Sequence, residues 1–477
     1  MTQYKVTFQP QGLSVSVDSG CNLLQAQILA GLRPDAPCGG KGTCGKCRVI
    51  LDGREILACQ TTVDRDMTVF TKEKSDARIL TEGLAVAIQP DGTDDYVLAF
   101  DIGTTTVVAY LLDGHTGTLL ARGSCVNPQG QYGADVISRV QQVLEEGGQR
   151  MADCIRKAMH QLAQDTADRA GIPLEKITAS AIVGNTAMHH LLLNIDPQPL
   201  VIPPYMPKVS QAMERNGARI LPNIAGFVGG DTVGCMVATR FDQLEELTLL
   251  IDIGTNGEMV LGDRNRRIAC STAAGPAFEG AKISCGMRGA EGAVDHVRLE
   301  NGVISYHTIG DAAPKGLCGS GLLDLVAVLL DEEIIDESGR MEEKQYRLCD
   351  NVVLTQKDVR EVQLAKAAIR AGIELMSERL GVQVSDIQRV YLAGAFGNYM
   401  DPASACRIGM IPPVLQDRIV PIGNAAGEGA KLCALSRAEF AYSRKLAEET
   451  EFLELASLPQ FQDCYVDALE FCEEEEE

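Results

Sequence analysis

Most of the fold is decided by residues 96–106, which read YVLAFDIGTTT. The apolar run before Asp101 predicts a buried β-strand, and the glycine and threonines after it predict a tight turn into a second strand. Residues 249–261, LLIDIGTNGEMVL, repeat this pattern, with Asp252 in the place of Asp101. Such a repetition predicts an internally duplicated α/β domain.

Each copy is followed by a second signal, a buried strand that ends in glycine. The first of these strands ends at Gly184 and the second at Gly394. Residues 363–380 form a long amphipathic stretch before the second strand, and Gly381 after it is typical of a helix end. The two halves of the domain are therefore expected to share one topology.

The turns after Asp101 and Asp252 suit phosphate binding. A hairpin with glycine at its tip lets backbone N–H groups and a threonine hydroxyl approach phosphate oxygens closely. A carboxylate at the end of each strand can hold Mg²⁺, directly or through water, so we expect both aspartates to be catalytic. The alternative is a pair of ordinary hairpin turns. The phosphate contacts are expected from Gly103, Thr104, Thr105, Thr106, Gly254, Thr255 and Asn256.

A second motif precedes this domain. Residues 38–47 read CGGKGTCGKC, and four glycines stand between their three cysteines. Glycines let a loop turn sharply and point backbone N–H groups at sulfur, which stabilises an anionic cluster. With the later Cys59, the gaps between cysteines are five, two and eleven residues. We predict a [2Fe–2S] cluster held by Cys38, Cys44, Cys47 and Cys59.

Two other interpretations of these cysteines exist. A structural zinc site also uses four cysteines, but zinc ribbons usually present two separate C-x-x-C knuckles. A thioredoxin-like redox pair at Cys44 and Cys47 needs a βαβ pattern around it, and none is present.

Alternating residues predict strands over 4–8, 13–17, 48–51 and 67–71 and a short helix over 22–30. We expect a small iron–sulfur domain over 1–71 and a linker over 72–95. The duplicated α/β domain follows over 96–472, in two lobes of about 96–247 and 248–440, before an acidic tail over 473–477.

Composition limits the partners. Lysine and arginine number 43 against 65 aspartates and glutamates, and the net charge of −22 argues against nucleic acid and anionic membranes. No apolar stretch reaches the length of a membrane span, and the N-terminus lacks a signal-peptide core. We therefore expect a cytoplasmic protein, in whose reducing environment the 16 cysteines are ligands or free thiols rather than disulfides.

These motifs resemble two known families. The cysteine pattern resembles the ferredoxin-type [2Fe–2S] domain, a β-grasp fold. The two hairpins resemble the phosphate-1 and phosphate-2 loops of the acetate and sugar kinase, Hsp70 and actin superfamily. That resemblance implies ATP and Mg²⁺ as ligands. It also implies an adenosine motif at Gly394, Ala395, Phe396 and Gly397 and a connecting helix that contains Gly427.

The pairing of the two domains resembles the reductive activators of corrinoid proteins. This resemblance implies an ATP-hydrolysing electron transferase that reduces Co(II) to Co(I) for methyl transfer. It implies a corrinoid protein as partner, an electron donor such as ferredoxin or flavodoxin, and a homodimer. Better-known members carry an extra middle domain after the ferredoxin part, where this chain has only residues 72–95.

Alternatives remain at this stage. The chain could activate another low-potential metalloenzyme, such as a dehydratase, or it could be a nucleotide-binding iron–sulfur electron carrier or redox sensor. Segments 229–234, 274–280 and 316–321 are glycine-rich, and each either lines the interlobe cleft or forms a tight helix entry.

Overall fold

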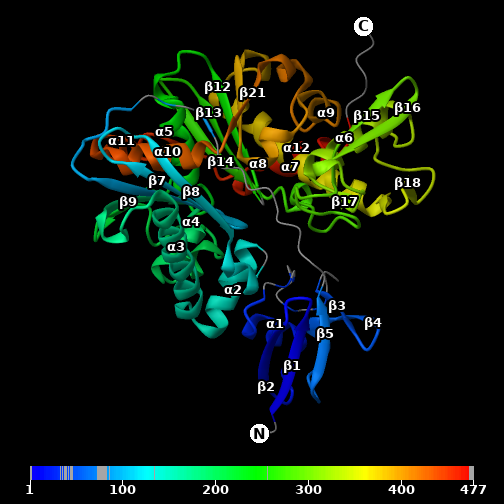
Figure 1. The fold of residues 1–477 in the computed structure, drawn as a ribbon. Helices are drawn as coiled ribbons and strands as arrows, with labels where there is room; N and C mark the ends of the chain where they lie inside the picture. Colours follow the sequence, from blue (N-terminus) through cyan, green and yellow to red (C-terminus); the bar gives the residue numbers. More distant parts are fainter. Residues whose placement is uncertain are drawn as a thin grey trace.

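Figure 1 shows a small N-terminal sheet beside a larger α/β body with two sheets. The computed structural model describes residues 3–32, 34, 36, 40, 42, 47–71, 83–84, 86, 88–133, 135–254 and 256–471. No helix in these ranges is long and apolar enough to cross a membrane.

The N-terminal domain is a five-stranded sheet with one helix packed on it. The strand order is β2-β1-β5-β3-β4. Asn22 caps the helix by accepting a hydrogen bond from the backbone N–H of Gln25. The elements of this domain confirm the predicted strands and helix. They are β1 (Gln3–Gln9), β2 (Leu13–Asp18), α1 (Leu23–Leu29), β3 (Arg48–Leu51), β4 (Arg54–Leu57) and β5 (Met67–Thr71).

The first half of the larger body contains a six-stranded sheet in the order β10-β11-β9-β6-β7-β8. Helices α2 (Val136–Glu146), α3 (Gln149–Ala170) and α4 (Thr186–Leu193) cover one face of it with a closed apolar core. The strands are β6 (Tyr96–Ile102), β7 (Thr106–Asp113), β8 (Leu119–Val126), β9 (Ile177–Gly184), β10 (Met213–Arg215) and β11 (Ala218–Ile220).

The second half contains a sheet in the order β21-β20-β12-β13-β14-β22. Its outer face shares an apolar core with α6 (Gly319–Asp331), α7 (Gln356–Leu380), α9 (Pro402–Arg407) and α12 (Phe461–Asp467). The strands of this sheet are β12 (Thr248–Ile253), β13 (Gly257–Gly262), β14 (Arg267–Thr272), β20 (Arg389–Ala393), β21 (Ile419–Gly423) and β22 (Glu451–Phe452). Five further strands lie outside it: β15 (Ala293–Glu300), β16 (Val303–Thr308), β17 (Gly316–Leu317), β18 (Gln345–Cys349) and β19 (Val352–Thr355).

The two sheets confirm the predicted duplication. In the first, β6 pairs antiparallel with β7 and parallel with β9, so that Ile102 faces Gly184. In the second, β12 pairs antiparallel with β13 and parallel with β20, so that Asp252 faces Ala393, one residue before Gly394. The two quoted hairpins therefore occupy equivalent places in the two sheets.

Two helices lie between the sheets and close the body. They are α5 (Gly230–Thr239) and α10 (Ala425–Leu435), and α11 (Arg437–Glu448) packs against both. One apolar core contains residues from both helices and from both sheets, including Val97, Val108, Leu250 and Val260. This shared core brings the ends of β6 and β12 together.

One helix boundary differs from the sequence expectations. Helix α7 begins at Gln356, seven residues before the predicted start, because Thr355 and Asp358 form a capping box. Within the predicted linker, Leu84, Val86 and Ile88 pack against the core between the sheets, and Gly83 forms a β-bridge with Gly423.

Candidate nucleotide cleft and iron–sulfur site

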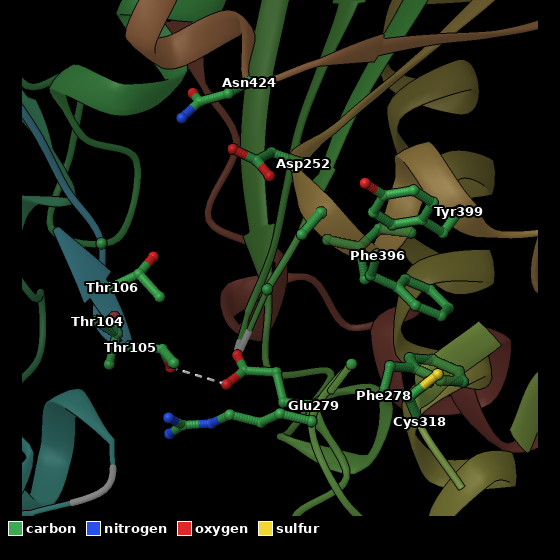
Figure 2. Close-up of a pocket in the computed structure, with 18 of the residues that line it drawn as sticks. Thr104, Thr105, Thr106, Asp252, Phe278, Glu279, Cys318, Phe396, Tyr399 and Asn424 are labelled. Atoms are coloured by element: carbon green, nitrogen blue, oxygen red, sulfur yellow. Dashed lines mark hydrogen bonds between the residues drawn. The ribbon is translucent and has the colours of Figure 1, made fainter. Parts of the chain in front are cut away.

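A cavity of about 330 Å³ lies between the two sheets (Figure 2). It is lined by the tips of both hairpins, by the start of α5 and by the start of α10. The start of α8 (Gly394–Tyr399) completes the wall. Strand ends and helix starts thus supply much of the lining.

The tip of the first hairpin turns its carbonyl groups away from the cavity. Asn127 Nδ2 donates to Gly103 O at 2.8 Å, and the Asn127 backbone N–H donates to Thr105 O at 2.8 Å. Arg139 donates to Thr104 O at 2.6 Å. In a trans peptide the next N–H points opposite to the carbonyl. The N–H groups of residues 104–106 therefore point away from Asn127 and Arg139, as an anion site in the adjoining cavity requires.

A buried arginine and a half-buried asparagine fix this tip. The Arg139 side chain is fully buried behind it, and burial lowers the pKa of its guanidinium to about 10, which leaves it charged at neutral pH. Asn185 Nδ2 donates to Thr104 Oγ1 at 2.9 Å, so the Thr104 hydroxyl keeps its own proton for a ligand. Asn185 also caps α4, which holds its side chain in place.

The second hairpin has a similar tight turn. The Gly254 N–H donates to Asn256 O at 2.9 Å, and both residues line the cavity. Thr255, the third residue predicted here, lies outside the described residues. Gly394 approaches from the neighbouring strand with a φ of +80°, and a β-carbon there would lie 2.7 Å from Asp252 Oδ1. Only glycine fits at this position.

Six acidic residues line the cavity, and the pKa is raised for four of them: Asp101, Asp231, Asp252 and Glu258. Burial raises the pKa of Asp101 to about 6, and burial together with the Asp101 charge raises that of Asp252 to about 6. Burial and the nearby Asp252 raise the pKa of Asp231 to about 7, and burial also raises the pKa of Glu258. Crowded carboxylates of this kind favour a bound cation.

Within the described ranges, no three His, Cys, Asp or Glu side chains are arranged to hold a metal ion by themselves. Mg²⁺ usually keeps several waters and binds through one or two carboxylates together with substrate phosphates. Asp101 and Asp252, at equivalent strand ends, fit that kind of shared site. They suit a cation that arrives with a phosphate ligand better than a closed protein cage.

Asn424 connects the cavity to helix α10. Its Nδ2 donates to Asp101 Oδ2 at 2.8 Å and to the Tyr110 hydroxyl at 3.2 Å, while its Oδ1 accepts from the Gly427 N–H at 2.7 Å. This hydrogen bond favours the ionised form of Asp101 and opposes the effect of burial on its pKa. The cap of α10 therefore orients one of the predicted catalytic residues.

The predicted adenosine motif lies across the cavity. Gly394, Ala395 and Phe396 line it, and the Phe396 ring stacks on Phe278 with centroids 4.7 Å apart and planes at 12°. Gly397 is buried against Leu392 and is not part of the lining. Gly427 is likewise outside the lining, because it packs against the ring and hydroxyl of Tyr110.

The three glycine-rich segments with open roles all reach the cavity. Segment 229–234 supplies Asp231, segment 274–280 supplies Phe278 and Glu279, and segment 316–321 supplies residues 318–320. No individual site role was predicted for Asp231, Glu258 or Asn424, although Asp231 lies in segment 229–234 and Glu258 in the second quoted hairpin. The acidic and amide side chains beside the glycines were the available signal.

The described part of the cysteine site fits an iron–sulfur cluster. Cys47 and Cys59 are both buried, and the Ala58 N–H donates to Cys47 O at 2.8 Å, which joins their two segments. Gly40 has a φ of +88°, and a β-carbon there would lie 3.8 Å from the Cys59 β-carbon. Gly40, within the glycine-rich motif, therefore lies beside Cys59, as the prediction requires. Cys38 and Cys44 lie outside the described residues.

Gln60 adds a polar group to this site. Its Nε2 donates to Cys59 Sγ at 3.6 Å, and it lies against Gly42, where a side chain would collide with it. N–H groups near cysteine sulfur stabilise the anionic form of a bound cluster. The donor set and its surroundings are thus compatible with the cluster.

Family comparisons agree with this division of the chain. Residues 6–68 match the 2Fe-2S iron-sulfur cluster binding domain, which confirms the predicted cluster type. Residues 96–244 match the RACo middle region, and residues 246–477 match the C-terminal domain of RACo, the ASKHA domain. The predicted absence of a middle region is therefore wrong: the region so described is the first half of the duplicated body.

One relative aligns with nearly the whole chain and another with about half of it. The corrinoid activation enzyme RamQ of Eubacterium limosum is 30% identical over 95% of this chain and 97% of its own length. A Methanosarcina barkeri protein, the [Co(II) methylated amine-specific corrinoid protein] reductase, is 28% identical over 52% of this chain and 51% of its own.

A solved structure, the reductive activator for corrinoid, iron-sulfur protein, aligns with a TM-score of 0.71 at 29% identity. The alignment covers 98% of both chains, so it includes the cysteine domain as well as the duplicated ATPase-like body. Together with the relative that is 30% identical over 95% of this chain, this match shows that the chain belongs to the family of corrinoid activation enzymes.

Proposed function

We propose that this chain uses ATP to reduce the Co(II) corrinoid of a partner protein to Co(I). The observation that carries the proposal is the union in one chain of a [2Fe–2S] ligand site and a duplicated nucleotide cleft. The partner's corrinoid is the substrate, and it gains one electron. ATP and water become ADP and phosphate, and an external low-potential donor, such as a ferredoxin or flavodoxin, supplies the electron.

The chain's own residues have distinct roles in this proposal. The N–H groups of residues 104–106 and the Thr104 hydroxyl hold phosphate oxygens, with Gly254 and Asn256 opposite them. Asp101 and Asp252 hold Mg²⁺ and water, and Mg²⁺ supplies charge neutralisation when it is bound. Cys38, Cys44, Cys47 and Cys59 would hold the cluster, which carries one electron at a time when it is bound.

Energetics explain why ATP is useful here. Ferredoxin-type clusters have potentials near about −400 mV. An electron acceptor ~100 mV lower costs about 2.3 kcal/mol per electron. A nucleotide that binds one conformation of the complex more tightly can offset a cost of that size. The cleft between two lobes is the element whose closure could carry such a preference.

The experiment combines the purified full-length protein, its cluster intact, with a Co(II) corrinoid protein, a low-potential reductant and Mg-ATP. We expect Co(I) to appear in the absorbance spectrum only when ATP and the activator are both present. A Cys59→Ser variant should hydrolyse ATP but produce no Co(I). Equal Co(I) yields with and without ATP would contradict the proposal.

Three finer features stay predictions. The homodimer rests on the resemblance to corrinoid activators, and light scattering of the purified chain measures it directly. The physiological donor can be found by comparing reduction rates with ferredoxin and with flavodoxin. The cytoplasmic location likewise awaits a direct measurement.

A further inference from the structure

One hydrogen bond crosses the cleft between the two halves of the body. Thr105 Oγ1 donates to Glu279 Oε2 at 2.9 Å, and the dashed line in Figure 2 marks this bond. Thr105 belongs to the first hairpin tip, whereas Glu279 follows the second sheet, 174 residues later. The bond is therefore a direct link between the two lobes.

The Glu279 carboxylate also lies near the second hairpin. Its Oε1 is 3.9 Å from the place that a β-carbon on Gly254 would occupy. The carboxylate is thus between the two tips, where a phosphate held by both hairpins belongs. A carboxylate and a phosphate both accept hydrogen bonds and both carry negative charge, so they compete for the Thr105 hydroxyl and repel each other.

The backbone that carries Glu279 is tightly packed. Gly280 has a φ of +74°, and a β-carbon there would collide with the backbone of Met287. A β-carbon on Gly319 would collide with Phe278 O. Because these close approaches fix the short helix η6 (Ala277–Glu279), the Glu279 side chain is the part that can move most easily.

A second cavity, of about 530 Å³, lies behind this residue. Thr104, Thr105, Glu279, Met287 and Arg288 line both cavities. Across the second cavity lie Leu24 and Ile28 of α1 and the nearby Leu32. A change at Glu279 therefore alters a wall that faces the iron–sulfur domain.

We propose that Glu279 is a positioning residue that occupies the terminal-phosphate place of the nucleotide-free cleft. ATP must displace it from Thr105, and the displaced side chain changes the wall that faces α1. This inference rests on the proposed function, because it takes the cleft to be the nucleotide site. Glu279 then sets the relative affinity for ATP and ADP, since its negative charge repels the terminal phosphate that only ATP carries.

The test uses the full-length protein with its cluster and the variant Glu279→Gln. Glutamine keeps a hydrogen-bond acceptor for Thr105 but removes the charge. We expect the variant to bind a non-hydrolysable ATP analogue about tenfold more tightly, with a smaller gain for ADP, by isothermal titration calorimetry. The matched control is Glu291→Gln, an exposed residue in the same lobe, whose nucleotide affinity should equal that of the unsubstituted protein.

A second readout follows the displacement itself. The ATP analogue should change hydrogen exchange in residues 276–288 of the unsubstituted protein, and this change should be smaller in Glu279→Gln. If the Gln variant does not fold, Glu279→Ala is measured in its place with the same expectation. Unchanged affinity with a loss of turnover would overturn the inference, because it indicates a residue that acts on water.

The failure of the two proposals can be told apart. If the unsubstituted protein binds neither ATP nor ADP, the nucleotide assignment of the cleft is wrong, and the inference falls with it. If it binds both, and Glu279→Gln and Glu279→Ala bind the ATP analogue no more tightly, only the role of Glu279 is wrong.

Discussion

At the scale of single residues, the cleft contains several carboxyl groups that are not all ionised at neutral pH when no cation is bound. Asp101, Asp231 and Asp252 have pKa values of about 6, 7 and 6, against an ordinary value of 3.8, chiefly because they are buried. A bound cation favours the ionised form and lowers these values. Binding of Mg-nucleotide should therefore expel protons from the site.

This coupling gives a pH-dependent prediction. At pH 6.5 a fraction of these carboxyl groups is protonated, so binding of a Mg-bound ATP analogue should release about one proton, whereas release should approach zero at pH 8.5. Calorimetry in buffers of different ionisation enthalpy measures the number. Asp252→Asn should release fewer protons at pH 6.5. A release that is the same at both pH values would contradict the raised pKa values.

The same pKa shifts have a definite sign for stability. A carboxyl group with a raised pKa in the folded state adds stability that is complete below its unfolded pKa of 3.8. That contribution is lost as the pH rises through about 6 for Asp252. The free energy of unfolding of the nucleotide-free protein is therefore expected to fall as the pH rises from 3.8 through about 6. Above pH 6, a bound cation should restore part of this stability.

Sequence reasoning found some of these residues and not others, for a physical reason. Asp101 and Asp252 follow apolar strands and precede glycine, so local pattern alone marks them. Asp231 reaches the same cavity only because α5 packs between the two sheets, which no local pattern specifies. The Thr105–Glu279 bond joins lobes that are distant in sequence, so it was equally inaccessible.

At the scale of elements, the segment that precedes β6 is part of the ATPase-like body. Gly83 bridges Gly423, and Asp91 accepts hydrogen bonds from Ser436 and from the Arg437 N–H at the start of α11. The apolar residues at 84, 86 and 88 repeat with a period of two, which is typical of an extended segment with one buried face. This signal was present within the predicted linker.

Gly83 lies against the cap of α10. A β-carbon there would be 2.7 Å from Asn424 O and 2.7 Å from Glu428 Cγ. We expect Gly83→Val to displace Asn424, weaken its hydrogen bond to Asp101 and reduce nucleotide affinity several-fold, since one such bond contributes about 1 kcal/mol. Calorimetry with the ATP analogue measures the loss, and the visible spectrum of the cluster should not change.

Thr93→Val is the matched control for this variant, because Thr93 is exposed in the same segment. Its nucleotide affinity should equal that of the unsubstituted protein. If Gly83→Val also binds nucleotide normally, the segment is a passive connection and the contact with Asn424 has no functional weight.

The start of α7 shows how an element boundary can be missed. β19 ends at Thr355, and the helix begins at the next residue, so a strand runs into a helix without a loop. The Thr355-x-x-Asp358 capping box was the local signal for the true start. The start of the helix was missed because the apolar residues of the strand before it resemble the apolar face of the helix.

At the scale of the whole molecule, the duplicated topology followed from two motif pairs, but the relation between domains did not. The second cavity places α1 opposite the wall formed by Thr105, Glu279 and Arg288. No sequence pattern predicts such a contact, because it depends on the length and path of the connecting chain. Residues 72–82, which join the two domains, are therefore a useful place to test the coupling.

A longer connection should separate ATP turnover from electron transfer. Inserting about eight Gly and Ser residues after Ser75 lets the iron–sulfur domain sample a larger volume. The insertion therefore lowers the effective concentration of this domain at the wall of the larger body that faces α1. Turnover of ATP should be unchanged, because the cleft is formed within residues 101–426. Formation of Co(I) per ATP hydrolysed should fall, as measured by parallel phosphate-release and absorbance assays. An equal ratio in the extended and unsubstituted proteins would show that the domain acts as a freely tethered carrier.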